Sequence, residues 1–436
     1  MHSSQLKFAD EPETAAPPDW RPLPQTLGDL GLPEIFLAHL ALKQCFYLDV
    51  FNLGELAERL RLPPAIVSQL VDYLRKEKFV EFRGADPLRP AVNPLSLAHR
   101  LALTESGKRR AAQLLEYDAY TGPAPVPLPE YFHQVARQTI RLTEIKPDRL
   151  RAAMEGLVIS PELVEQLGAA AMSGKPLFLY GPSGNGKTTI ALRLAKIWDD
   201  VILVPYALYV EGQVIRVFDA ITHQPAATAA PETGDRRWVR CRRPTVVMGG
   251  ELVLEMLDLA FNPTLNYYEA PLQLKANSGL LLVDDFGRQQ WSPEALLNRW
   301  IIPLENRQDF LRLKTGQKFA IPFDHFLIFA TNLEPRSLVD DAFLRRLRAK
   351  VKVDHVSREQ FAEIFRLVCQ GYDLAFDPGA LKYLLHHHYD AYARPLSACH
   401  PRDLLEHILD WARFHGLTPA LTPESLDRAC RSYFVY

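Results

Sequence analysis

The stretch PLFLYGPSGNGKTTIALRLA, residues 176–195, decides the fold of this chain. Four apolar residues at 177–180 predict a buried strand, and apolar residues from Ile190 onward recur at helical spacing. Between them, GPSGNGKT at 181–188 fits the pattern GxxxxGK[ST] at every fixed position. The glycines let backbone N–H groups wrap around phosphate oxygens, and the start of the helix adds partial positive charge. The stretch therefore predicts a phosphate-binding loop between a strand and a helix.

This loop predicts a site for ATP and Mg²⁺. Lys187 would neutralise charge on the β- and γ-phosphates, and the Thr188 hydroxyl would ligate Mg²⁺. The loop residues that we expect to contact the nucleotide are Gly181, Pro182, Ser183, Gly184, Asn185, Gly186, Lys187, Thr188 and Thr189.

A second apolar run, GLLLVDDFGRQ at 279–289, predicts another buried strand. Its four apolar residues precede Asp284 and Asp285. Downstream of a phosphate-binding loop this is the Walker B pattern, in which a buried parallel strand carries a carboxylate to its C-terminal end, beside the phosphates. We therefore expect Asp284 to hold Mg²⁺ through water, together with Thr188.

Three further features follow in order along the chain. FDHFLIFATN predicts a strand that leads to Asn332, DDAFLRRLRAKVKVD carries Arg345 and Arg346, and HPRDLLEHILDWA begins a helix with Arg402. This ordered set of Walker A, Walker B, a strand ending in Asn, an arginine pair and a helical PRDLL resembles the AAA+ superfamily of ring-forming ATPases, in general look the bacterial MoxR-like proteins. The resemblance covers residues 150–436 and implies an α/β P-loop NTPase core with a parallel sheet and a C-terminal helical lid.

The resemblance also implies roles for these residues. Asn332 matches sensor 1, which hydrogen-bonds the γ-phosphate or the attacking water. Arg345 and Arg346 match the arginine finger, which compensates transition-state charge at the nucleotide of a neighbouring subunit, and either of the two fits this role. Arg402 matches sensor 2, on the lid helix over the nucleotide. Because the finger acts across a subunit interface, a homo-oligomer is implied, with a hexameric ring favoured.

Two more parts of the nucleotide site rest on the same resemblance. Asp285 occupies the position where most family members carry Glu as the base that orients the attacking water. Asp is one methylene shorter, so we expect slower hydrolysis or a differently positioned water. GLVISPELVEQL, before the loop, resembles the wall on the adenine side, with Val158 and Ile159 as contacts.

The N-terminal part carries a different pattern. Helical spacing in EIFLAHLALKQCFYL, LGELAERLRL and AIVSQLVDYLRKEKFV is followed by two strand signals and a helix that Thr104 caps. This order resembles a winged helix-turn-helix domain, a small α+β unit, over residues 30–118. Its third helix offers Arg75, Lys76 and Lys78 only at its end, so DNA binding and protein docking both stay open.

Proline clusters suggest the division of the chain. Pro12 to Pro24 predict an extended leader, and TGPAPVPLP predicts a stiff spacer at a domain boundary. The expected division is a flexible leader at 1–26, a winged-helix domain at 27–120, a linker with an incoming helix at 121–150, the nucleotide-binding core at 151–355 with a hairpin insertion near 209–248, and the helical lid at 356–436.

The insertion holds two candidate binding features. We interpret VILVPYA as the second strand of the core sheet, followed by a β-hairpin of EGQVIRVFDAI and RRWVRCRRPTVVMGG. Tyr267 and Tyr268 lie where loops of related rings grip a substrate, or else they pack on the subunit surface. Five arginines at 236–243 form a basic cluster that could bind a phosphate backbone or an acidic partner, or remain a solvated strand face.

Composition limits the function. Lys and Arg total 50 and Asp and Glu total 52, so the formal net charge is −2. The charge of the chain as a whole therefore gives no argument for nucleic-acid binding. No apolar run would span a bilayer and no secretory signal opens the chain, so a cytoplasmic protein is expected. The sequence predicts an ATPase that remodels a macromolecular partner. The alternative is a DNA-associated ATPase, and a nucleotide-gated switch with little turnover is a third possibility.

Overall fold

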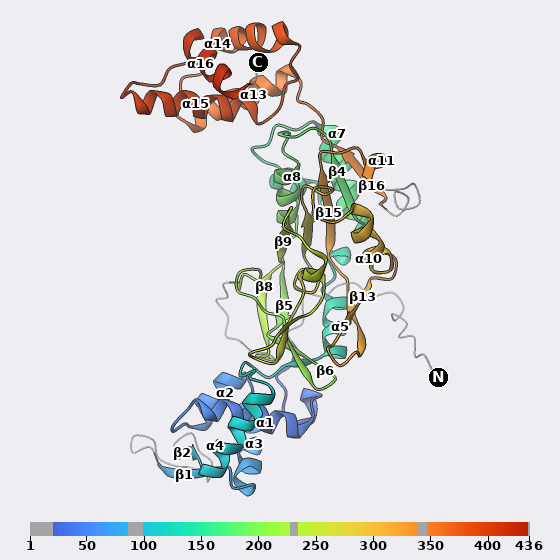
Figure 1. Ribbon diagram of the computed structural model, residues 1–436, viewed down its shortest axis with the longest axis vertical. Helices are drawn as coiled ribbons and strands as arrows, with labels where there is room; N and C mark the ends of the chain where they lie inside the picture. The colour runs from blue at the N-terminus through green and yellow to red at the C-terminus, as the bar shows by residue number, and fades with distance from the viewer. Residues whose placement is uncertain (1–20, 86–98, 227–233, 339–346, 435–436) are drawn as a thin grey trace.

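The computed structural model describes residues 21–85, 99–226, 234–338 and 347–434. Figure 1 shows four bodies that follow one another along the long axis of the molecule: a small α+β unit, a β-rich body, an α/β core and a helical bundle at the C-terminal end. Within the described ranges, no helix combines the length and the apolar character that crossing a bilayer requires.

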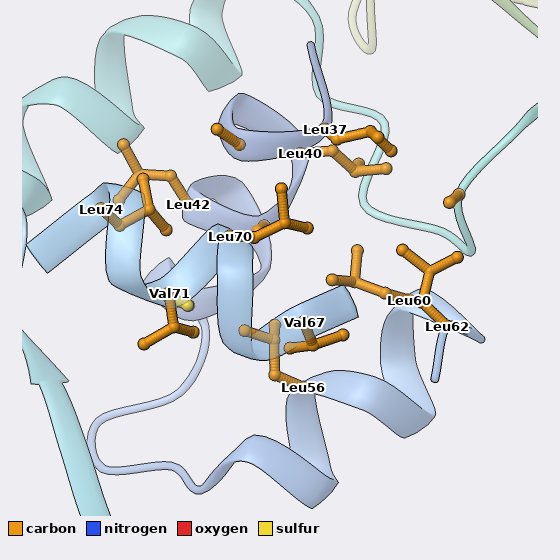
Figure 2. Close-up of a cluster of buried hydrophobic side chains, with 14 of the residues drawn as sticks. Leu37, Leu40, Leu42, Leu56, Leu60, Leu62, Val67, Leu70, Val71 and Leu74 are labelled. Atoms are coloured by element: carbon orange, nitrogen blue, oxygen red, sulfur yellow. The ribbon is translucent and has the colours of Figure 1, made fainter. Parts of the chain in front are cut away.

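The N-terminal unit has the element order that the sequence predicts. Its elements are α1 (Glu34–Phe46), α2 (Leu53–Leu60), α3 (Pro64–Lys76), β1 (Val80–Ala85), β2 (His99–Leu103) and α4 (Glu105–Tyr117). Asn52 forms a capping box with Glu55, and Thr104 accepts a hydrogen bond from the backbone of Gly107. Leucine and valine side chains at helical spacing on α1, α2 and α3 meet in one buried cluster (Figure 2), and the antiparallel β1–β2 pair closes the unit.

The core is built on a five-stranded parallel sheet. Its order is β16 (Ala349–Lys352), β4 (Leu177–Tyr180), β15 (Phe326–Thr331), β12 (Leu280–Val283) and β9 (Thr245–Met248). Side chains alternate between the two faces, as strand geometry requires. Leu177 and Leu179 pack with α7 (Pro161–Ser173) and α8 (Lys187–Leu194), whereas Phe178 packs against α10 (Pro293–Asn306) on the other face. A parallel sheet covered by helices on both faces agrees with the α/β P-loop NTPase core that the sequence predicts.

The second strand of this sheet is not the one that we expected. VILVPYA does form a strand, β5 (Val201–Pro205), but it pairs antiparallel with β8 (Trp238–Arg242) outside the core. The parallel sheet instead takes β9, which pairs with β12. Both segments are short apolar runs, so periodicity alone does not distinguish them.

The β-rich body, here the β subdomain, lies between the core and the N-terminal unit (Figure 1). Besides β5 and β8 it contains β3 (Val126–Pro127), β6 (Ala207–Val210), β7 (Gln213–Arg216), β10 (Ala260–Asn262), β11 (Tyr267–Glu269), β13 (Gln308–Arg312) and β14 (Lys318–Pro322). The expected hairpin near 209–248 is wrong in its pairing, because β7 pairs with β6 and β11 while β8 pairs with β5.

One apolar cluster unites this subdomain although four separate stretches of chain supply it. Tyr131 on α5 (Leu128–Arg137), Ile202, Tyr268 and Ile321 all belong to it. The proline-rich segment is therefore no free spacer, since β3 pairs with β6 and α5 packs into the same cluster. The segment keeps an extended backbone in β3, and the burial of apolar side chains fixes it to the β subdomain.

The C-terminal bundle contains the four helical segments that the sequence predicts. They are α13 (Arg358–Gly371), α14 (Pro378–Leu384), α15 (His400–Phe414) and α16 (Pro423–Tyr433). Their apolar faces form one cluster that includes Phe361, Phe365 and Leu405. Ser357 and Thr422 begin α13 and α16 with capping boxes.

A buried arginine joins the N-terminal unit to the β subdomain. Arg237 is only 1% exposed, and its guanidinium donates to Asp235 Oδ2 over 2.7 Å. It also donates to the carbonyl oxygens of Leu30 at 3.2 Å and Pro125 at 3.4 Å. A guanidinium has five donors in a rigid fork, so one side chain can connect several backbone segments.

Two neighbouring arginines are also held in ion pairs. Arg236 donates to Glu58 on α2 over 2.7 Å. Arg243 pairs with Asp200 over 2.6 Å and donates to the carbonyl of Gln138 over 2.8 Å. Three of the five arginines are thus held by partners within the molecule, which counts against both the binding surface and the solvated strand face that the sequence left open. These charges stabilise the contacts between parts of the molecule.

Replacing Arg237 by methionine should destabilise the protein strongly. The change leaves the Asp235 carboxylate buried without its cation, which costs about 3–5 kcal/mol of unfolding free energy. Urea denaturation at pH 7 measures this loss. Arg242→Met, on the exposed side of β8, is the matched control and should stay within about 0.5 kcal/mol of the native protein. Equal losses in the two variants would contradict the role of Arg237.

Candidate functional site

The loop at 181–188, here the P-loop, joins β4 to α8 at the carboxyl edge of the sheet. Gly181, Gly184 and Gly186 have φ angles of 130°, 78° and 84°, a region that favours glycine. A Cβ atom on Gly181 would lie 2.2 Å from the Val353 carbonyl oxygen, so this position also needs the absence of a side chain. The loop can therefore wrap closely with its backbone amides available to an anion.

The Lys187 side chain folds over the P-loop. Its ammonium donates to the carbonyl oxygens of Gly181 and Pro182, each over 2.8 Å. Burial lowers the pKa of this ammonium, and the nearby carboxylates of Asp284 and Asp285 act in the opposite direction. A cation is thus placed at the mouth of a loop of backbone donors, which suits a polyphosphate.

Thr188 and Asp284 meet although they are far apart in the sequence. The Thr188 hydroxyl donates to Asp284 Oδ2 over 2.7 Å, which joins the first turn of α8 to the end of β12. A hydroxyl and a carboxylate in contact are the oxygen donors that Mg²⁺ takes beside phosphates. Asp285 follows with φ 48° and an exposed side chain, and its backbone N–H donates to Asp284 Oδ1 over 3.0 Å.

Asn332 reaches the same edge from the neighbouring strand. Thr331 pairs with Tyr180 in the parallel register, so Asn332 follows β15 at the level at which Gly181 follows β4. The Asn332 Oδ1 atom is buried and has no hydrogen-bond partner. An unpaired buried amide oxygen costs stability, and such a cost at this edge favours a role in ligand binding.

For the other expected site residues the structure gives burial and position in the fold. Val158 and Ile159 are half-buried before α7, and Ile159 packs against the core cluster. Arg402 is exposed on the first turn of α15. Arg345 and Arg346 lie outside the described residues.

Tyr267 and Tyr268 are not a gripping pair on a pore surface, which corrects that interpretation. Tyr267 is 8% exposed and packs edge-on against Tyr120 of the N-terminal part, with ring centroids 5.7 Å apart. Tyr268 is 2% exposed, and its hydroxyl accepts a hydrogen bond from the backbone of Lys314. Both rings serve packing.

Sequence reasoning missed Gln289. This side chain is buried behind the end of β12, where its amide donates to the Asp284 carbonyl over 3.1 Å and its oxygen accepts from Gly287 over 2.8 Å. It thereby fixes the turn that carries Asp284 and Asp285. The only signal for it is a polar residue close behind the acidic pair.

Residues 357–432 match a family described as a domain of unknown function, DUF8689. Among curated proteins, none matches the chain.

Solved structures give distant similarities. The chain is similar to NtrX from Brucella abortus, with 12% identity, a TM-score of 0.38 and coverage of 73% of this chain and 59% of NtrX. It is also similar to the RuvB Holliday junction branch migration motor of Thermotoga maritima, with 14% identity, a TM-score of 0.35 and coverage of 66% and 70%. Domain III of the replication initiation protein DnaA from the same organism is similar with 13% identity, a TM-score of 0.36 and coverage of 67% of this chain and 99% of the DnaA domain. The chain spans less than two thirds of NtrX, and similarities this distant carry no conclusion about activity.

Removing the Asn332 amide should separate stability from activity. In Asn332→Ala the unpaired oxygen is gone, so the unfolding free energy of the nucleotide-free protein should be unchanged or rise by up to about 1 kcal/mol. Turnover of nucleotide should fall by about tenfold or more. Thr331→Val is the matched control, because it removes a hydroxyl that donates to the Phe286 carbonyl, and it should lose about 1–3 kcal/mol. A large loss of stability in Asn332→Ala would contradict a ligand-binding role.

Proposed function

We propose that this chain binds ATP with Mg²⁺ at the P-loop and hydrolyses it to ADP and phosphate. The observation that carries the proposal is the 2.7 Å contact between the Thr188 hydroxyl and Asp284 Oδ2, beside a glycine-rich loop with a lysine at its mouth. Two stretches of chain that lie 96 positions apart bring these groups together, and the groups supply chemically different parts of a triphosphate site.

Each residue has a distinct part in the proposed reaction. The P-loop amides and Lys187 hold the phosphates, and Thr188 with Asp284 holds Mg²⁺, which supplies charge neutralisation on the phosphate oxygens. The Asp285 carboxylate and the Asn332 amide orient a water for in-line attack on the γ-phosphate. One arginine of the pair Arg345 and Arg346 compensates charge at the site of a neighbouring subunit in a hexameric ring.

The proposed consequence of hydrolysis is a change in the angle between core and lid. The bundle at 356–436 joins the core after β16, and Arg402 on α15 is the proposed lid contact to nucleotide. Because the N-terminal unit and the β subdomain are joined by Arg236, Arg237 and shared apolar packing, they would move together as one arm.

We further propose that the partner on which this arm acts is a protein. The arginine cluster, the main support for a nucleic-acid surface, is largely held in ion pairs. The N-terminal unit, which we take to be a winged helix, exposes Tyr73 and Phe82 on α3 and β1 at 40% each. Exposed aromatic side chains of this kind suit protein docking. DNA binding through α3 is the alternative.

Phosphate release with ATP and Mg²⁺ tests the activity. Lys187→Ala should lower turnover by about a hundredfold or more, because the charge on the β- and γ-phosphates loses its cation. Lys196→Ala, an exposed lysine beyond α8, is the control and should keep native turnover. Native turnover in Lys187→Ala would overturn the proposed site. Equal negligible rates in the native and Asp285→Asn proteins, with Asp285→Glu active, would favour a nucleotide-gated switch.

Mass photometry tests the assembly and the partner class. The native protein with ADP, and Asp285→Asn with ATP, should assemble to about six subunits, whereas the nucleotide-free protein should not. Duplex DNA should leave these masses unchanged. A monomer under all conditions would remove the assignment of Arg345 and Arg346 as a finger. A mass shift that requires DNA would favour the DNA-associated alternative.

A further inference from the structure

The loop that precedes α15 lies directly against the P-loop. The Cys399 backbone N–H donates to the Gly184 carbonyl oxygen over 2.9 Å. The neighbouring Ala398 N–H donates to the Asn185 Oδ1 atom over 3.1 Å. These two hydrogen bonds connect Gly184 and Asn185 of the P-loop to a segment more than two hundred positions further along the chain. We call this pair of hydrogen bonds the lid latch.

Asn185 is shaped for this contact. It is 5% exposed, and its amide nitrogen donates to the carbonyl oxygens of Pro182 and Ser183, each over 3.4 Å. The Asn185 amide nitrogen therefore stabilises the P-loop, while its amide oxygen binds the backbone of the segment before α15. The approach is close at Gly184 as well, since a Cβ atom there would lie 2.6 Å from the Cys399 sulfur.

The latch is supported on the side of the bundle. The Tyr433 hydroxyl, at the end of α16, donates to Asp403 Oδ2 over 2.6 Å and lies 3.8 Å from the Cys399 sulfur. The Asp403 backbone N–H in turn donates to the Cys399 carbonyl over 3.1 Å. Arg402 lies between Cys399 and Asp403, so whatever fixes these two residues also fixes the backbone of Arg402.

We propose that Asn185 and the Gly184 carbonyl act as positioning groups that set Arg402 over the nucleotide through the lid latch. This rests on the proposed function. The Gly184 carbonyl and the Asn185 N–H belong to one peptide group, and hydrogen bonding at one end of a peptide group strengthens it at the other. A phosphate that accepts from the P-loop amides thereby tightens the lid contact, and by reciprocity the latched lid tightens phosphate binding.

Hydrogen exchange on the nucleotide-free protein tests whether the latch holds. Mass spectrometry of peptides around 395–405 should show slow exchange of the Ala398 and Cys399 amides in the native chain. Asn185→Ala removes the acceptor of the Ala398 N–H, so exchange should rise by about fivefold or more. Cys399→Ala keeps its N–H and should match the native protein. Fast exchange of both amides in the native chain would overturn the proposal without involving nucleotide.

A double-mutant cycle tests the positioning of Arg402. Arg402→Ala should raise the Kd of a fluorescent ADP analogue with Mg²⁺ by about tenfold. Cys399→Pro, which removes the donor to Gly184, should raise it by a similar factor, and Cys399→Ala should stay near native. If the latch acts through Arg402, the double variant Cys399→Pro/Arg402→Ala is no weaker than Arg402→Ala alone.

The outcomes separate the two proposals. Additive losses in the double variant would overturn the positioning role while leaving nucleotide binding intact. A thermal unfolding scan of Cys399→Pro excludes misfolding as the cause, and Asn185→Ala provides an independent break on the other side of the latch. A native protein that binds no nucleotide would overturn the proposed function and the positioning role together, and the exchange result would still decide whether the lid latch exists.

Discussion

The parallel register of β4, β15 and β12 is the constraint on which the candidate site depends. Because these strands run in the same direction and pair in register, their carboxyl ends meet at one edge. Gly181, Asn332 and Asp284 each follow one of these strands. The three strands are buried on both faces, so a slip of one residue would exchange the side chains that pack on the two faces and disturb the packing of both. Apolar packing of the sheet therefore determines where the polar groups of the candidate site lie.

The β subdomain shows how a second body is built without a continuous stretch of chain. Segments before β4, between α8 and β9, between β9 and β12, and between α10 and β15 all contribute to its apolar cluster. Elements of the core lie between these segments in the chain, so the core brings their ends together. Conversely, Arg243 reaches from the start of β9 to the carbonyls of Gln138 and Ser278, which ties the subdomain to two core strands. We infer that the core and the β subdomain unfold together.

The lid is attached differently. It contacts the P-loop through backbone hydrogen bonds at Gly184 and an amide at Asn185, with the thiol of Cys399 close behind. Two hydrogen bonds of modest net worth, about 1 kcal/mol each, suit a contact that is made and broken, whereas the buried Arg237 network suits a permanent one. The molecule thus joins its N-terminal unit firmly to the β subdomain and its lid lightly to the P-loop.

The sequence alone was sufficient for the elements that local pattern encodes. The strand, glycine loop and helix at 177–194 were predicted because the loop's chemistry constrains residue type at fixed spacing, and the C-terminal helices because apolar residues recur with the helical period. The pairing partners of β5, β7 and β8 were not predicted, because the sequence of a short apolar strand does not specify which strand it pairs with. The arginine cluster and the pair Tyr267 and Tyr268 read as exposed for the same reason: whether a charge or ring faces solvent depends on segments that only the tertiary structure brings against it.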